Sequence, residues 1–96
     1  MFVSSCLVVL RPGQSEPLHK HRTPEWLYVV KGSPVITLHT IKNRVTRWQC
    51  VSIPSECPHA IDNDGQEDVV IIWNYISHTD KVRKMMSNII ILRRTD

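Results

Sequence analysis

Short runs of β-branched and aromatic residues follow one another along this 96-residue chain, and turn signals separate them. An Arg-Pro-Gly triplet closes the first run, a glycine ends the second, and residues 63–65 (Asn-Asp-Gly) are a strong turn signal. Turn signals about every 8–12 residues are typical of an all-β sandwich or closed barrel. The runs that we predict as strands are residues 2–10, 25–31, 35–41, 44–53, 59–63, 69–76 and 88–92, with residues 42–43 as a turn.

Length and composition indicate a single domain, residues 1–96, because chains usually divide into domains only at much greater length. The chain is 42% hydrophobic and 22% charged, as in ordinary globular proteins, which excludes a disordered tail or a fibrous repeat. The uncharged run at residues 1–10 is about half the length that crosses a bilayer, so we expect no membrane partner. We predict one short helix, at residues 79–87.

The net charge of +3 is too small and too scattered to require an anionic polymer as partner. Five of the 12 lysines and arginines lie in the last sixteen residues, where a solvated surface explains them. We therefore expect no nucleic-acid partner.

The cysteines, Cys6, Cys50 and Cys57, are odd in number and follow no paired spacing. No signal sequence is recognisable in the chain. These features favour reduced thiols and a cytoplasmic location, and we interpret Cys57 as a loop thiol.

Histidine and glutamate residues stand at spacings that suit a metal site. His19 and His21 are two apart, so in an extended strand their side chains share one face. Glu25 begins the next apolar run, across a bend that Pro24 permits, and His59 opens a later strand. Three imidazoles and one carboxylate suit one divalent transition metal: Fe, Mn, Ni, Co or Zn. His39 and His78 have no partner at ligand spacing, and we interpret them as structural or surface residues.

Two segments between residues 13 and 63 resemble the paired motifs of the cupin family. The segments read Gly13-x5-His19-x-His21-x3-Glu25-x6-Gly32 and Pro54-x3-Pro58-His59-x3-Asn63. The resemblance implies a small jelly-roll β-barrel of the RmlC-like type. The metal would lie inside one end of the barrel, held by residues that resemble the family's ligands: His19, His21, Glu25 and His59.

The second motif departs from the family pattern at three positions. Trp48 and Glu56 stand where the family usually has glycine, and Gln49 stands where it has Asp. These departures concern the local turns, because all four ligand positions are retained.

The resemblance leaves the reaction open, since cupins include dioxygenases, decarboxylases, isomerases, epimerases and non-catalytic members. Four ligands on a six-coordinate metal leave two positions, which suit a substrate that chelates through two oxygens, or one substrate oxygen together with dioxygen. We therefore expect an enzyme that acts on a small oxygen-rich metabolite by oxygenation or isomerisation. The alternatives are a non-catalytic ligand-binding or sensing domain, and a barrel whose metal only stabilises a small core.

Large aromatic residues lie in the predicted strands. We assign Trp26, Tyr28 and Trp73 to the barrel wall or to a contact between two copies of the chain. A small barrel with exposed edge strands and several such residues favours a homodimer.

Overall fold

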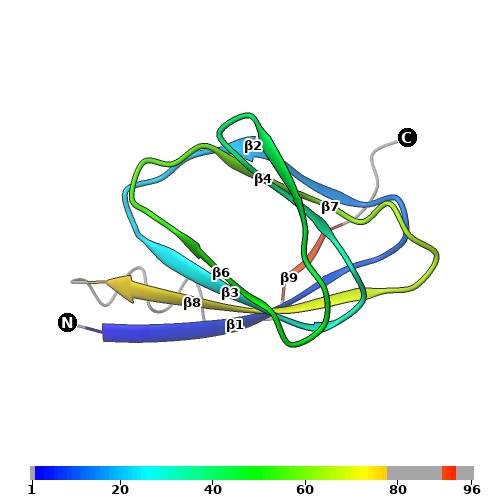
Figure 1. The fold of residues 1–96 in the computed structure, drawn as a ribbon. Coiled ribbons are helices and arrows are strands. Elements are labelled where there is room, and N and C mark those ends of the chain that lie inside the picture. The colour runs from blue at the N-terminus through cyan, green and yellow to red at the C-terminus, as the bar shows by residue number, and fades with distance from the viewer. Residues whose placement is uncertain (1, 78–89, 93–96) are drawn as a thin grey trace.

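The computed structural model describes residues 2–77 and 90–92, and all regular secondary structure within these ranges is β-strand. The strands form two sheets that face one another (Figure 1), which confirms the predicted all-β jelly-roll barrel. The strands are β1 (Phe2–Leu10), β2 (Ser15–His19), β3 (Glu25–Lys31), β4 (Val35–Leu38), β5 (Ile41–Arg44), β6 (Cys50–Ile53), β7 (His59–Asp62), β8 (Val69–Ser77) and β9 (Ile90–Leu92).

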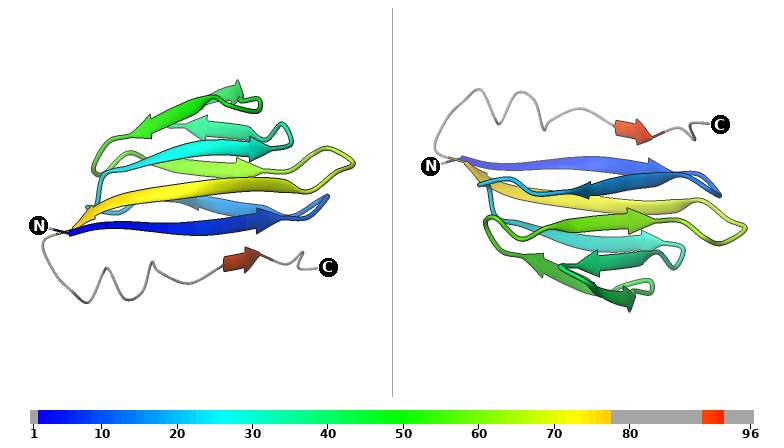
Figure 2. Two further views of the ribbon diagram at one scale, coloured as in Figure 1. Left: turned by 90° about the horizontal axis from the view of Figure 1, so that it is seen from below. Right: turned by 90° about the horizontal axis from the view of Figure 1, so that it is seen from above.

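One sheet has five strands in the order β6-β3-β8-β1-β9, and the other has four in the order β2-β7-β4-β5. The long antiparallel pair of β1 and β8 runs from Phe2 opposite Ser77 to Leu10 opposite Val69, and Figure 2 shows the two strands side by side. Strand β9 pairs with β1 in parallel. The pairing of non-consecutive strands brings residues far apart in the chain to the same end of the barrel.

The core follows the alternation of side chains along each strand. Every second residue of β1 from Ser4 to Leu10 is buried, and Val69 begins the same pattern in β8. Burying each large aliphatic side chain stabilises the fold by about 1.5–3 kcal/mol. The fully buried aliphatic residues are Val8, Leu10, Leu27, Val29, Ile36, Ile53, Ile61, Val69 and Ile71.

The three aromatic residues singled out in the sequence take different positions. Trp73 is buried inside the barrel, whereas Trp26 and Tyr28 are half-buried on the other face of β3 from Leu27. Trp73 therefore belongs to the barrel wall. A homodimer that uses Trp26 and Tyr28 stays a prediction.

Two predicted boundaries differ from the structure. Residues 42–43 lie inside β5, because the turn falls earlier, at His39, whose φ of 57° lets the chain reverse. The predicted strand 44–53 is also interrupted, since Trp48 has a φ of 71° and separates β5 from β6. Asn43 and His39 are both residue types that tolerate positive φ, so residue type alone could not decide which of the two forms the turn.

The predicted helix at residues 79–87 lies outside the described residues. Within residues 2–77 and 90–92, the chain contains no helix with the length and apolar character needed to cross a bilayer.

Asn63 ties three segments together at the end of β7. Its amide nitrogen donates to the carbonyl oxygens of Leu10 at 2.8 Å and Glu67 at 2.9 Å, and its side-chain oxygen accepts from the Gly65 amide at 3.1 Å. Asn63 is only 2% exposed, so these bonds satisfy a polar group that would otherwise be costly to bury. This second-motif residue has a structural role.

Gly32 allows a close contact at the end of β3. Its φ is 84°, and a Cβ atom there would lie 2.8 Å from both the Asp68 carbonyl oxygen and Val69 Cγ2. Only glycine fits this combination of backbone angle and space.

We expect Gly32→Ala to lower the free energy of unfolding by roughly 2–4 kcal/mol, because the added methyl group would meet backbone in a strained conformation. Gly65→Ala is the matched control, since its Cβ would meet Asn63 Oδ1 at an ordinary 3.5 Å. The control should change stability by less than about 1 kcal/mol. Denaturant unfolding measures both variants, and equal losses would contradict this account.

Candidate metal centre

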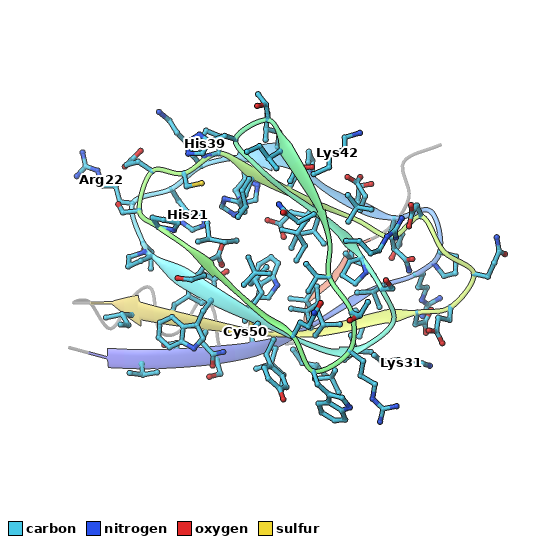
Figure 3. The ribbon with its side chains drawn as sticks, viewed as in Figure 1. His21, Arg22, Lys31, His39, Lys42 and Cys50 are labelled. Atoms are coloured by element: carbon cyan, nitrogen blue, oxygen red, sulfur yellow. The ribbon has the colours of Figure 1, made fainter. Side chains whose placement is uncertain are left out.

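Three histidines converge inside one end of the barrel. His19 ends β2, His21 lies in the bend that follows, and His59 begins β7. His19 and His59 are opposite one another in the β2–β7 pair, and their ring centroids are 4.3 Å apart. Figure 3 shows His21 pointing into the space between the two sheets, whereas Arg22 points outward. One ligand nitrogen from each histidine lies within 4.8 Å of the others.

Backbone carbonyl groups fix the orientation of two of these rings. His19 Nδ1 donates to the Pro17 carbonyl oxygen at 2.8 Å, and His59 Nδ1 donates to the Cys57 carbonyl oxygen at 2.8 Å. A carbonyl oxygen only accepts, so Nδ1 carries the hydrogen in both rings. In the neutral rings Nε2 then has a free lone pair, which is the arrangement that metal-binding histidines use.

The fourth predicted ligand, Glu25, lies against two of the histidines. It is the first residue of β3, and its inward orientation follows from the alternation that also buries Leu27. Glu25 Oε1 is 2.8 Å from His59 Nε2 and 3.1 Å from His21 Nε2. The side chains of Glu25 and His59 are both 1% exposed. A carboxylate oxygen so close to the Nε2 lone pair of a neutral ring needs a cation between them, either a proton or a metal ion.

The buried polar atoms without a hydrogen-bond partner gather at this site. Of the seven such atoms among the described residues, five belong to Glu16, His21, Glu25 and His59. Native proteins rarely leave buried polar groups unsatisfied, so such a cluster indicates that something else contacts them. The donor set, imidazole nitrogens with carboxylate oxygens, fits a divalent transition metal.

The structure thus brings together all four residues predicted as metal ligands. That they bind a metal stays a prediction, whereas their proximity is an observation. His39, which we interpreted as structural or surface, is exposed in the turn after β4. Cys57 lies in the loop before β7, as expected, but is buried.

Glu16 is a fifth member of the site that the sequence interpretation missed. It is 7% exposed, and its Oε1 is 2.8 Å from His19 Nε2. Residues three apart in a regular strand face opposite sides, so the pattern places Glu16 away from His19. A register shift between Glu16 and His19 in the β2–β7 pair brings both toward the interior. Pro17, which lies between them, could have indicated the irregularity, because proline within a strand often marks a bulge.

Burial, together with the negative charge of Glu25, shifts the pKa values of several groups. Burial and then the charge of Glu25 raise the pKa of Glu16 to about 8, and the same two causes raise the pKa of Tyr75. Burial, followed by Glu25 and Glu16, raises the pKa of Cys6 to about 11. Burial alone would lower the pKa of His59, but the contacts with Glu25, the Cys57 carbonyl and Glu16 together outweigh it, so the pKa is raised. In all four groups the charge of Glu25 raises the pKa, which is the direction in which a nearby positive charge would be favoured.

The two positions where the second motif lacks glycine keep a glycine-like backbone. Trp48 has a φ of 71° and Glu56 a φ of 62°. The Glu56 amide donates to the His21 carbonyl oxygen at 2.8 Å, which joins the loop before His59 to the bend that carries His21. The unusual residues therefore leave the turns in place but add backbone strain, because left-handed backbone is costly for residues with a Cβ atom.

A family model described as "Cupin domain" matches residues 6–75, which include all five residues of the site. The uncharacterised protein MJ1618 of Methanocaldococcus jannaschii is 34% identical over 61 residues, which make up 62% of this chain and 49% of that protein. The chain therefore spans about half the length of this curated relative.

Solved structures share the fold. The chain is similar to a predicted oxalate decarboxylase from Thermotoga maritima, with 28% identity, a TM-score of 0.68, and coverage of 71% of this chain and 60% of that one. It is also similar to the cupin domain of Cnp3 from Schizosaccharomyces pombe (TM-score 0.75, 15% identity, 86% and 61% coverage). An RmlC-like cupin from Shewanella frigidimarina has a TM-score of 0.66 at 17% identity, with 74% and 62% coverage. At 15% and 17% identity, the last two similarities show the fold alone.

We expect Glu56→Gly to be more stable than Glu56→Ala by about 1 kcal/mol, because only glycine adopts the φ of 62° without strain. Both variants lose the carboxylate and its weak contacts with Lys20 and Arg22. The difference between their free energies of unfolding therefore reports the backbone strain at this position. Thermal or denaturant unfolding of the two variants measures it. Equal stabilities would show that the loop relaxes without cost.

Proposed function

This chain belongs to the cupin family, and on that premise we propose that it holds one divalent transition metal, Fe, Mn, Ni or Zn, with His19, His21, Glu25 and His59. We further propose that it acts at this centre on a small oxygen-rich metabolite, by oxygenation or isomerisation. The observation that carries the proposal is the convergence of three imidazole nitrogens within 4.8 Å of one another, with a buried carboxylate in contact.

The four residues have distinct roles in this proposal. The three neutral imidazoles supply nitrogen ligands, and the Glu25 carboxylate offsets one unit of the metal's charge. The carbonyl groups of Pro17 and Cys57 hold two of the rings with Nε2 directed into the site. When bound, the metal would act as a Lewis acid that acidifies a substrate hydroxyl, and iron could in addition activate dioxygen.

Access to the site is uneven. The side chains of His19 and His21 are 38% and 29% exposed, whereas those of His59 and Glu25 are 1% exposed. A small molecule would therefore approach from the side of His19 and His21. The buried pair on the far side would keep its geometry while the substrate binds, since close packing holds both side chains.

Two buried hydrogen-bond donors on the five-stranded sheet support an oxygen-rich ligand. Ser4 Oγ and Trp73 Nε1 are buried and have no partner among the residues that the structure describes. Ser4 pairs with Tyr75, which in turn pairs with Glu25, so Ser4 lies on the same inner face as the site. Hydroxyl, carbonyl or carboxylate oxygens of a ligand would satisfy such donors. The similarity to the Thermotoga maritima protein, a predicted oxalate decarboxylase, also supports a small molecule rich in oxygen.

A second candidate is a non-catalytic ligand-binding or sensing barrel with a structural metal. Its specific support is that the predicted ligands come from both sheets: Glu25 from the five-stranded sheet, and His19 and His59 from the four-stranded sheet. A metal bound there would join the two layers of a small domain, which is how structural metals stabilise a fold.

Elemental mass spectrometry on protein purified without chelator should find about one equivalent of Fe, Mn, Ni or Zn, since the donor set suits these metals. The double variant His19→Ala/His21→Ala should lose it. His39→Asn is the matched control, because it removes an exposed histidine and places a residue that tolerates positive φ. Wild-type protein that carries no metal and takes none up would contradict the proposal.

The identity of the metal then selects the activity assay: oxygen consumption for Fe, and isomerase screens for Zn or Mn. His59→Ala should abolish turnover while the domain stays folded if the centre is catalytic. Binding of a ligand without its consumption would favour the sensing barrel. A large fall in Tm on adding a chelator would favour the structural metal.

A further inference from the structure

Glu16 is a buried carboxylate that the proposed four-residue centre leaves unused. Its side chain is 9% exposed, and neither carboxylate oxygen has a hydrogen-bond partner within residues 2–77 and 90–92. The nearest charged or basic atom is His19 Nε2, at 2.8 Å from Glu16 Oε1. Because Nδ1 of that ring already holds its hydrogen against Pro17, the neutral ring presents a lone pair, not a donor, to the carboxylate. Two electron-rich atoms in this position need a proton or a metal ion between them.

The distances around Glu16 match those between ligands of one metal ion. With metal–ligand bonds of about 2.0–2.2 Å, adjacent ligands of a six-coordinate ion are roughly 3.0 Å apart and opposite ligands roughly 4.2 Å. Glu25 Oε1 has the adjacent spacing, at 2.8 Å from His59 Nε2 and 3.1 Å from His21 Nε2. Glu16 Oε1 is 2.8 Å from His19 Nε2 and 4.0 Å from His59 Nε2. These distances would allow Glu16 Oε1 to contact the same cation as His19 Nε2 and His59 Nε2.

We propose that Glu16 is a fifth ligand of the metal centre, so that the donor set is three imidazoles and two carboxylates. This inference rests on the metal binding proposed above. Two carboxylates would balance the charge of a divalent cation, which favours binding in a site where most ligands are buried. The register shift in the β2–β7 pair is the feature of this chain that makes the fifth ligand possible.

A fifth ligand changes what the centre can bind. On a six-coordinate metal, one position stays open in place of two. A ligand that binds through a single oxygen fits without rearrangement, whereas one that chelates through two oxygens must displace the Glu16 carboxylate. The substrate class favoured by the intact centre is therefore one with a single metal-binding oxygen.

The test uses Co²⁺ as a probe, because its visible absorption intensifies as its coordination number falls. Metal-free wild type, Glu16→Gln and Glu16→Ala are loaded with Co²⁺, and their affinities are measured by competition with a coloured chelator. Each substitution should weaken Co²⁺ binding by at least about tenfold, given what supporting residues of metal sites contribute. The visible absorption of the Glu16→Ala complex should become stronger than that of wild type. Circular dichroism checks that the metal-free variants fold.

Glu56→Gln is the matched control, since Glu56 lies in a neighbouring loop and its side chain is 50% exposed. It should keep the wild-type affinity and spectrum. If both Glu16 variants also keep them, Glu16 is not a ligand and the inference is wrong, while the four-residue centre stands. If wild-type protein binds no Co²⁺, the proposed function fails first, and the inference fails with it.

Discussion

The grouping of two carboxylates and three imidazoles inside the barrel is the constraint on which the rest of the structure depends. Glu25 and His59 are almost fully buried and only 2.8 Å apart. Glu16 Oε1 lies 4.0 Å from His59 Nε2, and neither Glu16 oxygen has a hydrogen-bond partner in the described part of the chain. Leaving such groups without a cation would cost a domain of 96 residues a large share of its small net stability. A bound metal would convert this cost into a stabilising contact between the two sheets.

The rest of the barrel keeps these groups in place. Strand alternation turns Glu25 inward beside Leu27, the β2–β7 register shift turns Glu16 inward, and carbonyl groups hold two of the rings. The Glu56 amide joins the loop before His59 to the bend at His21. All of these features depend on the backbone, through strand alternation, the register shift and carbonyl or amide hydrogen bonds. A small domain can therefore hold the site without long covering loops among its described residues.

The all-β class and the grouping of His19, His21 and Glu25 could be predicted because both depend on local patterns: turn spacing for the strands, and short fixed intervals for the three residues. The jelly-roll barrel and the place of His59 in the site were predicted through the resemblance to the cupin motifs. The sequence did not predict Glu16, since a register shift depends on which strand lies opposite, and that is a tertiary property. The turn at His39 and the break at Trp48 were missed for a related reason. Both residues have positive φ, which histidine tolerates and tryptophan does not favour, and their amides donate to carbonyl groups distant in the sequence, Pro58 for His39 and Val29 for Trp48.

The most direct test of this account is a crystal structure of the metal-loaded protein, with diffraction recorded at the absorption edge of the metal. The account predicts one anomalous peak inside the barrel, about 2.0–2.2 Å from Nε2 of His19, His21 and His59 and from the carboxylate of Glu25. A barrel with no peak at this position, in which the imidazoles donate hydrogen bonds directly to the carboxylates, would contradict it.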